Sequence, residues 1–510
     1  MSDTSSTSTS TTTVKKLSKV TLFAYGCGDF ASNLCWTFVG SYLSIFYTDV
    51  VGMAPAIASM IMLIAKIWDG VNDPMFGLIA ERTNTRWGRF RPYILFGCPF
   101  LALFSVLTFT TIGSGTTAVI WACFTYIGCG MLYTVVNLSY GSLSTVMTND
   151  PEDISQLTSY RMIGTNLSSV LLNAITAPML AFFSATSDGS YTAKAYMIVA
   201  IIFAVCAVPI FIFVFAKCKE NIKPAANTVK VPITQSLKAV FTNKPLILLF
   251  FIQLFAMTAF FGRMGVVVYY VIYVIGRSDL ISIFMALPSL MTVVGIALTK
   301  NYTIKFGKKR MASIGYIGAG LSLIAIYLVG MMGGYSNIPL LVILHACYGF
   351  FCFSFPIPMS MIPDAIFYQQ DRTGVRADGV SYSAVSLATK FGSAFGVSGA
   401  LLIMGAFGYV ANAEQTATAI SGMNMTVNLL FGILYLLCLI PLHFYPLDEK
   451  RNAEIQASLA AKAAANVQPA ADSQTTTDTQ SSAGSQATAE AQATAESQAS
   501  AKPQSKESKK

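Results

Sequence analysis

Three charged residues lie close together inside one long apolar run of the sequence. The run reads MIMLIAKIWDGVNDPMFGLIA and contains Lys66, Asp69 and Asp73. Spacings of three and four residues place these side chains on one face of a helix. A charge at the middle of a bilayer costs about 3 kcal/mol or more unless it is paired or faces a cavity. The two carboxylates therefore predict a site for a proton or a monovalent cation.

The alternative is a structural ion pair in which Lys66 serves Asp69. One lysine cannot neutralise two carboxylates, so this alternative suits either acid alone better than both together. A second cation, Lys390, lies near the middle of another apolar run, VSLATKFGSAFG, and the two lysines together balance Asp69 and Asp73. Arg263 is a further charge within an apolar run. We expect it either to line a pathway or to extend toward the membrane surface.

Two other apolar runs carry polar residues at helical spacing. Amides and carboxylates beside an aromatic ring suit a neutral polyol, because hydroxyls need paired donors and acceptors while the apolar face of a sugar lies against a ring. The alternative is polar contact between neighbouring helices, which is common in membrane bundles. The residues are Tyr133, Thr134, Asn137 and Tyr140 in YTVVNLSYGSL, and Asp29, Asn33 and Trp36 in YGCGDFASNLCW.

The composition indicates an all-α integral membrane protein. Of the 510 residues 54% are hydrophobic and only 11% are charged, whereas soluble domains carry about 25% charged residues. Apolar runs of about 20 residues, the length that spans a bilayer as helix, recur along the chain and predict twelve transmembrane helices. The predicted organisation is a disordered N-terminus (1–19), a six-helix bundle (20–216), a cytoplasmic linker (217–245), a second six-helix bundle (246–446) and a low-complexity cytoplasmic tail (447–510).

The basic residues set the expected orientation and suggest an internal repeat. Nearly all of them lie at the N-terminus and in alternate loops, whereas Lys194 and Arg277 lie on the other side. This bias predicts a multi-pass protein of the cell membrane with both termini in the cytoplasm. The loop RWGRFRP and, six runs later, the loop KFGKKR share one pattern, with Gly88 and Gly307 between basic residues. The repeat predicts two six-helix halves in the same orientation, the major facilitator architecture.

Several other classes of function find no support in the sequence. The net charge of +9 comes from short loops between apolar runs, so it does not predict nucleic-acid binding. No GxxxxGK[ST] motif occurs, no CxxC spacing occurs, and His345 and His443 are isolated. We therefore expect no enzymatic activity, no metal centre and no cofactor beyond a coupling H⁺ or Na⁺. The expected partners are a small-molecule substrate, that cation and the lipid bilayer.

The motifs resemble those of the glycoside-pentoside-hexuronide:cation symporters, the group of the major facilitator superfamily that includes the melibiose carrier. The resemblance covers about residues 20–446. It rests on YGCGD, YTDVVG, IWDGVNDP, NTRWGRFRP, YTVVNLSYGSL and TGVRADGVSYS with Lys390. It implies a cation-coupled sugar symporter that works by alternating access.

The resemblance also implies roles for individual residues. The family's cation site corresponds to Asp69, Asp73, Thr134 and Lys390. The melibiose carrier has Asp at the positions of Asn33 and Asn137 and Trp at that of Tyr140, so the sugar and the choice between H⁺ and Na⁺ stay open, and the fewer acids favour a proton. The predicted sugar-binding residues are Asn33, Trp36, Tyr133, Asn137, Tyr140, Arg161, Ser386 and Lys390.

The expected mechanism rests on charge. Without a cation, unneutralised carboxylates at Asp69 and Asp73 would disfavour closing of the two halves, and a bound cation would relieve that repulsion. We favour a galactoside such as lactose as substrate, with glucuronides, pentosides and raffinose-type sugars as alternatives. Two rival functions are an amphiphile or lipid carrier and a sugar sensor that does not transport. The predicted cytoplasmic gate residues are Arg86, Arg89, Arg91, Lys308, Arg310 and Asp364.

Overall fold

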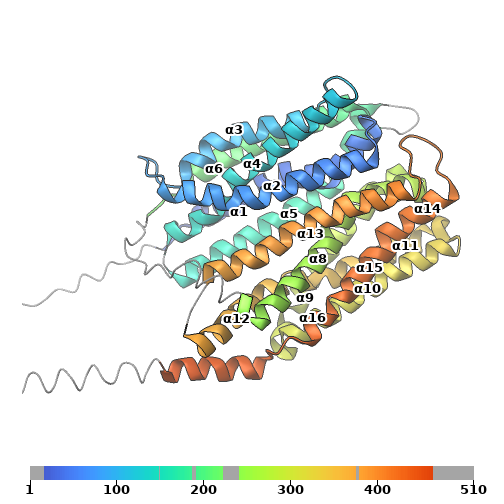
Figure 1. Ribbon diagram of the computed structural model, residues 1–510. Coiled ribbons are helices and arrows are strands. Elements are labelled where there is room, and N and C mark those ends of the chain that lie inside the picture. The colour runs from blue at the N-terminus through green and yellow to red at the C-terminus, as the bar shows by residue number, and fades with distance from the viewer. Residues whose placement is uncertain (1–15, 149, 186–190, 222–240, 375–377, 463–510) are drawn as a thin grey trace, which may run out of the picture. The chain divides into compact units, whose positions relative to one another are not determined.

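The computed structural model describes residues 16–148, 150–185, 191–221, 241–374 and 378–462, and these are almost entirely helical. The first half of the chain supplies six long helices (Figure 1). A π-helical turn, η1 (Phe46–Val50), continues the first of them. The six helices are α1 (Lys19–Ile45), α2 (Pro55–Arg82), α3 (Arg91–Thr108), α4 (Thr116–Met147), α5 (Pro151–Ser184) and α6 (Ala193–Lys217).

The second half is built in the same way but has more interruptions. Two π-helical segments, η2 (Tyr270–Ile275) and η6 (Met425–Leu430), continue α8 and α14. Short 3-10 turns are η3 (Ser278–Leu280), η4 (Gly334–Ser336) and η5 (Cys352–Ser354). The helices are α8 (Lys244–Tyr269), α9 (Ile281–Phe306), α10 (Lys308–Met331), α11 (Ile338–Phe351), α12 (Ile357–Thr373), α13 (Asp378–Ala406), α14 (Ala417–Asn424), α15 (Phe431–Leu437) and α16 (Leu439–His443).

Ten segments among the described residues are long and apolar enough to cross a bilayer. The helices α1 and α2 are as long, with 27 and 28 residues, but are not among these ten. They are the helices that carry Asp29, Lys66, Asp69 and Asp73. Together with them the described chain has the twelve spans of the major facilitator fold, as the sequence predicted.

Helix starts follow local rules that the sequence satisfies. The side chains of Ser18, Asp150, Thr192 and Asn243 each accept a hydrogen bond from a backbone N–H in the first turn of α1, α5, α6 and α8. Such caps satisfy the orphan donors at a helix start. The start of α3 is capped by the carboxylate of Glu220, which lies in the segment after α6. This carboxylate accepts hydrogen bonds from the backbone N–H groups of residues 89–91.

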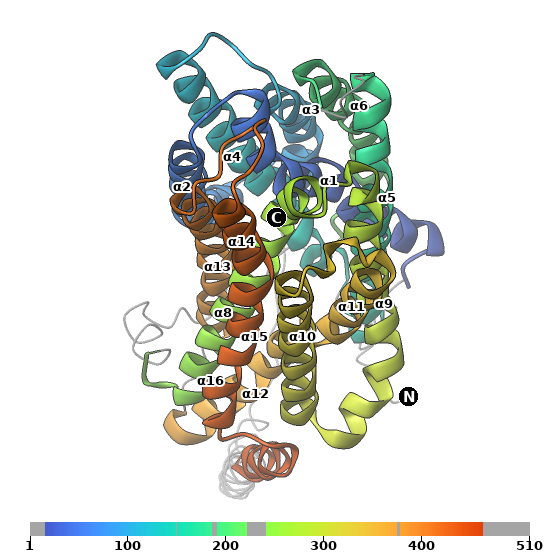
Figure 2. The ribbon, with the colours of Figure 1, turned by 90° about the vertical axis from the view of Figure 1, so that its right-hand side faces the viewer.

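The helices α1–α6 form one group and α8–α16 another (Figures 1 and 2). Three helix pairs join the groups: α1 packs on α8, α2 on α13 and α5 on α9. Within the second group, α8 and α13 approach closely because glycines meet at their contact. A Cβ at Gly396 would lie 2.5 Å from the Thr258 carbonyl oxygen and 2.8 Å from the Cα of Gly262. This pair holds Lys390 of α13 at a fixed distance from α8.

Polar contacts between the groups gather at the ends predicted to be extracellular. The Asp49 carboxylate, at the end of α1, accepts hydrogen bonds from the hydroxyls of Tyr273 and Tyr409. Nearby, the hydroxyls of Thr48 and Tyr269 lie 2.8 Å apart. In this conformation the two groups are therefore held together at that end.

The chain's last helical segment belongs to a separate compact unit. The described residues of this unit are 367–374 and 447–462, and residues 449–462 are helical. Within it, Lys462 Nζ lies 2.6 Å from the Asp371 carboxylate, which also accepts from Ser458 at 2.9 Å. The predicted low-complexity tail thus begins with a helix, and its remainder from residue 463 lies outside the described residues, as do most of the predicted N-terminal segment and linker.

The glycine contact gives a stability test. We expect Gly396→Ala to lower the free energy of unfolding by about 1–3 kcal/mol, because the added methyl overpacks the α8–α13 contact. Gly399 lies on the same helix with no atom within 4 Å of a built Cβ, so Gly399→Ala should be neutral or slightly stabilising. Thermal unfolding of the purified protein in detergent measures both. Equal effects of the two substitutions would contradict this packing.

Candidate functional site

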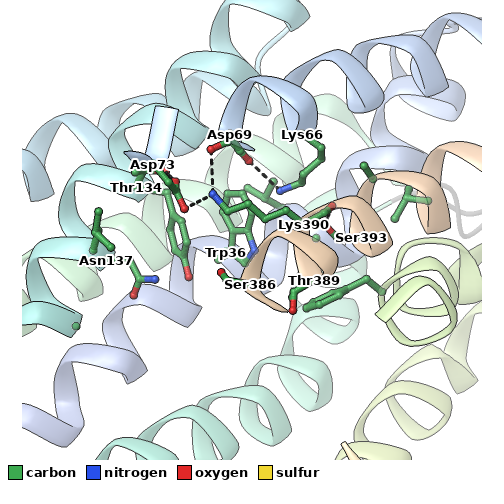
Figure 3. Close-up of a pocket in the computed structure, with 18 of the residues that line it drawn as sticks. Trp36, Lys66, Asp69, Asp73, Thr134, Asn137, Ser386, Thr389, Lys390 and Ser393 are labelled. Atoms are coloured by element: carbon green, nitrogen blue, oxygen red, sulfur yellow. Dashed lines mark hydrogen bonds and ion pairs between the residues drawn. The ribbon is translucent and has the colours of Figure 1, made fainter. Parts of the chain in front are cut away.

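The helix α2 presents Lys66, Asp69 and Asp73 toward one cavity (Figure 3). Lys66 Nζ lies 3.3 Å from Asp69 Oδ2. The other carboxylate oxygen of Asp69, Oδ1, is buried and has no hydrogen-bond partner among the described atoms. Pro74 lies inside the helix one residue after Asp73. It has no N–H for the carbonyl four residues earlier and so loosens α2 at this level.

Lys390 reaches this cluster from α13 in the other half of the molecule (Figure 3). Its ammonium forms an ion pair with the Asp73 carboxylate and donates to the Asp69 carbonyl oxygen at 2.9 Å. The Thr134 hydroxyl of α4 donates to Asp73 Oδ1 at 2.8 Å. The four residues predicted for the cation site therefore lie together.

The charges of this cluster cancel, and this corrects the expected mechanism. Lys66 lies beside Asp69 and Lys390 beside Asp73, so neither carboxylate is unneutralised in this conformation. The expectation of repelling carboxylates in the ion-free site is therefore wrong here. The physical reason is that each ammonium is within direct contact of one carboxylate, which offsets the cost of placing both charges inside the protein.

An aromatic pair connects this cluster to the next part of the cavity wall. The rings of Trp36 and Tyr133 are stacked, with centroids 4.2 Å apart. The Lys66 ammonium lies over the Trp36 ring, 4.0 Å from its centroid, a cation–π contact. Lys66 thus contacts both Asp69 and the aromatic pair.

The cavity itself is large enough for a disaccharide. Its volume is about 1110 Å³, at the upper end of the roughly 300–1,000 Å³ of ligand pockets. It extends from the α2 cluster to Thr145 and Tyr382, near the ends of α4 and α13 predicted to be cytoplasmic. The predicted site residues in its wall are Trp36, Asp69, Asp73, Tyr133, Thr134, Asn137, Arg161, Ser386 and Lys390.

Arg161 is held in the cavity wall by Asp29, which the sequence places on a polar face suited to a polyol but which is not among the predicted sugar-binding residues. Its Nε lies 2.6 Å from Asp29 Oδ2, and the Thr165 hydroxyl donates to the same oxygen at 3.1 Å. The guanidinium also lies over the Tyr140 ring, 5.2 Å from its centroid. Asp29 lies four residues before Asn33, and that helical spacing was the available signal for its position. No pattern marked Thr165.

Two predicted sugar-binding residues lie elsewhere. Asn33 is not among the cavity-lining residues, and its amide donates to the Asp29 carbonyl oxygen at 2.9 Å while its oxygen accepts from Thr37. Tyr140 is fully buried, stacks on Tyr25 and donates its hydroxyl to the Tyr25 carbonyl oxygen at 2.5 Å. In this conformation Tyr140 supports Arg161, and direct contact of either residue with a sugar stays a prediction.

The predicted gate residues of the first half make contacts within that half. Arg86 packs on Trp87, and the Arg89 guanidinium donates to the Ala80 carbonyl oxygen at 3.1 Å. Arg91 donates to the carbonyl oxygens of Trp87 and Phe215. These contacts, together with Glu220, fasten the loop after α2 to its own helix group.

The second half shows the same behaviour. Lys308 Nζ lies 2.7 Å from the Asp364 carboxylate and donates to the Ser360 carbonyl oxygen at 3.0 Å, so it joins α10 to α12. Arg310 is exposed. These contacts of the two gate loops lie inside one helix group, whereas the Lys390–Asp73 pair crosses between the groups at the cavity and the Asp49 contacts cross at the opposite end. A gate formed between the loops stays a prediction for another conformation.

Comparison with known families agrees with this architecture. The model of the family described as MFS/sugar transport protein matches residues 24–449. The chain belongs to this family. It is thereby a sugar symporter of the glycoside-pentoside-hexuronide:cation group, as its motifs indicated.

Two curated relatives carry informative names. The chain is 33% identical to the isoprimeverose transporter of Lactiplantibacillus pentosus over 448 residues, which are 87% of this chain and 91% of the relative. It is 30% identical to the glucuronide carrier protein homolog of Escherichia coli (strain K12) over 444 residues, 86% of this chain and 95% of that relative. Both are membrane transporters and not enzymes.

Solved structures give the same fold. A partially occluded inward-open conformation of the xylose transporter XylE from E. coli superposes with a TM-score of 0.58 at 11% identity, covering 84% of this chain and 98% of that one. A bacterial homolog of the human lysosomal transporter Spinster, inward-facing and unoccupied, gives a TM-score of 0.60 at 12% identity, covering 83% of this chain and 95% of that one.

The Lys66–Asp69 pair gives a second test. We expect Lys66→Met to lower the free energy of unfolding by about 1–3 kcal/mol, because it leaves a largely buried carboxylate without its ammonium. The double variant Lys66→Met/Asp69→Asn should recover most of that loss, since both charges are then gone. Thermal unfolding in detergent measures the unchanged protein, the two single variants and the double variant. If the loss of unfolding free energy in the double variant equals the sum of the losses in the two single variants, the Lys66–Asp69 pair contributes nothing to stability.

Proposed function

We propose that this chain imports a glycoside together with a monovalent cation, H⁺ or Na⁺, by alternating access across the cell membrane, with both termini in the cytoplasm. One observation carries the proposal: ion-paired carboxylates lie in the wall of the same cavity as the stacked pair Trp36 and Tyr133. Lys390 contacts Asp73 across the two halves, so the charge state of the cluster acts directly on the contact between them.

The first step concerns the carrier without ligands. Because Lys390 neutralises Asp73 and Lys66 neutralises Asp69, the halves can close around the cluster without burying an unpaired charge. An importer needs this property, since it must return empty after each cycle. The ion pair between α13 and α2 also holds the two halves in register during the return.

The second step is cation binding. A proton on Asp73, or Na⁺ held by the oxygens of Asp69, Asp73 and Thr134, competes with Lys390 for the same carboxylate. The unpartnered Oδ1 of Asp69 is a further oxygen available to the ion. Either ion releases the Lys390 ammonium into the cavity and leaves one excess positive charge. Closing on that charge is costly, so the carrier with cation alone does not cycle.

The third step is sugar binding. Sugar hydroxyls accept hydrogen bonds from the released Lys390 and from Arg161 and donate to the Asn137 amide oxygen, while the ring packs beside Tyr133. These hydrogen bonds replace those that the freed ammonium loses with water on closure, and they lower the cost of closing without removing the charge. Cation and sugar thus favour each other's binding, and this coupling is reciprocal.

The proposed substrate is a galactoside such as lactose. A galactose ring carries several C–H groups on one face, which suits an aromatic side chain, and hydroxyls on the other, which suit charged donors. The rival substrates to include in the uptake assay are isoprimeverose and glucuronides, which the names of two relatives mention. Uptake of a sugar panel by cells that express the chain, with added Na⁺ or with recording of external pH, identifies both ligands.

Asp73 gives the mutational test of coupling. We expect Asp73→Asn to reduce accumulation of the sugar against its gradient by about ten-fold or more, because the variant cannot exchange Lys390 for a cation. Glu152→Gln is the control, since Glu152 is an exposed acid paired with Lys16 at the surface. Accumulation by Asp73→Asn at the control level would refute the assignment.

The same assay separates the rival functions. A sensor would bind sugar without uptake into vesicles. An amphiphile carrier would transport no polar sugar of the panel and would tolerate loss of Asn137. Either result would remove the symport proposal.

A further inference from the structure

One buried charge lies away from the cavity and has no part in the mechanism above. Arg263 lies in the interior of α8 and is only 4% exposed. It is not among the cavity-lining residues, so it neither lines the sugar pathway nor extends to the membrane surface. A guanidinium cannot lose its proton in a protein. Its charge must therefore be balanced by something close by, because an isolated buried charge is costly.

The second half of the chain offers no carboxylate for this purpose. Arg263 forms no ion pair with the described residues, and its Nε and Nη2 atoms are buried without a hydrogen-bond partner among them. Arg263's own helix, α8, and the helices α9, α10, α11, α14, α15 and α16 of the same half contain no acidic residue, and α13 has one only at its first residue, Asp378. The acids of residues 244–443 are Asp279, Asp364, Asp371, Asp378 and Glu414.

The packing of α8 fixes the direction of Arg263. Gly262 and Gly265 face α13, where a built Cβ would meet Gly396 or Val397 within 3 Å. Arg263 instead faces α11, and its guanidinium lies over the Tyr348 ring, 4.5 Å from the centroid. The guanidinium therefore lies inside the second helix group, on the side of α8 that faces away from α13 and the central cavity.

A third unpartnered donor lies on the same face. Tyr270 follows Arg263 by seven residues, two helical turns, and its hydroxyl is buried without a partner. Its ring stacks on His345, with centroids 6.3 Å apart, and His345 precedes Tyr348 by three residues on α11. Two residues of α8 and η2 thus face two of α11. Because helical side chains lean toward the N-terminus of their helix, the Tyr270 hydroxyl leans toward Arg263.

Two unpartnered acceptors complete the surroundings. His345 Nδ1 must be the donor in its 2.8 Å contact with the Leu341 carbonyl oxygen, so Nε2 keeps a lone pair. Asn428 donates to Asn424 and its side chain lies beside the Tyr270 hydroxyl, while its side-chain oxygen is buried without a hydrogen-bond partner among the described atoms. Tyr270 and Asn428 lie in the π-helical segments η2 and η6, and such segments occur often at functional sites.

We propose that Arg263, together with the Tyr270 hydroxyl, binds a small monovalent anion the size of chloride inside the second helix group. Two buried N–H donors of Arg263, the Tyr270 hydroxyl and a positive charge that no carboxylate balances among the described residues match such an ion. Water bridges from the ion to the lone pairs of His345 and Asn428. Water alone would satisfy the hydrogen bonds and leave the charge unbalanced.

The experiment measures thermal unfolding of the full-length chain in detergent, in sodium chloride and in sodium gluconate at equal concentration. The sodium concentration is the same in both salts, so any effect of Na⁺ at the Asp69–Asp73 cluster is the same in both measurements. We expect chloride and bromide to raise the unfolding midpoint by several degrees over gluconate, as a ligand of the native state does. Arg263→Gln should abolish the difference. An equal midpoint of the unchanged protein in the two salts, or a chloride response that persists in Arg263→Gln, would overturn the proposal.

A milder variant keeps the test decisive if Arg263→Gln does not fold. Tyr270→Phe removes one donor and retains the charge and the ring, so the chloride concentration for half-maximal stabilisation should rise several-fold. Tyr42→Phe is the matched control, because Tyr42 of α1 also has a buried, unpartnered hydroxyl but lies in the other half of the chain. Identical chloride responses of the two variants would overturn the proposal.

Discussion

The ion pair between Lys390 and Asp73 joins the two halves of this carrier at the level of its cavity. Its partners lie on α13 and α2, which pack along each other. An ion pair of this kind has two stable states. Either its two side chains contact each other, or each of them contacts a ligand instead. Because a free charge in the protein interior is unfavourable, intermediate conditions are suppressed. This constraint links the chemistry of one carboxylate to the position of a whole helix group.

The aromatic pair extends that link to the substrate. Lys66 contacts Asp69 on one side and the Trp36 ring on the other, and Trp36 stacks on Tyr133 in the cavity wall. Arg161 reaches the same cavity from α5, held by Asp29 and supported by Tyr140. The ion-paired cluster of α2 and the aromatic part of the cavity wall are therefore linked through Lys66. At the ends predicted to be extracellular, the Asp49 contacts with Tyr273 and Tyr409 hold the halves together. The cavity extends in the other direction, toward the ends of α4 and α13 predicted to be cytoplasmic.

Local spacing was sufficient to predict the twelve helices and the α2 face, because hydrophobic length and helical period are properties of a single segment. It also predicted that Lys390 balances the acids, since only few cations lie in apolar runs. The contacts of Asn33 and Tyr140 could not be predicted, because a buried hydroxyl or amide satisfied by a backbone carbonyl leaves no trace in the sequence. The same holds for the gate loops: whether Arg89 or Lys308 binds its own half or the other depends on the conformation of the carrier.

The reciprocity of the two ligands is the central claim, and calorimetry of sugar binding to the purified protein tests it directly. The dissociation constant of the sugar is measured with and without saturating coupling ion, and that of the ion with and without saturating sugar. The account predicts that each ligand tightens the other by the same factor, within the roughly 5–150-fold range of such couplings, and that Asp73→Asn reduces the factor to one. Sugar affinity that is unchanged by the ion in the unaltered protein would contradict the account.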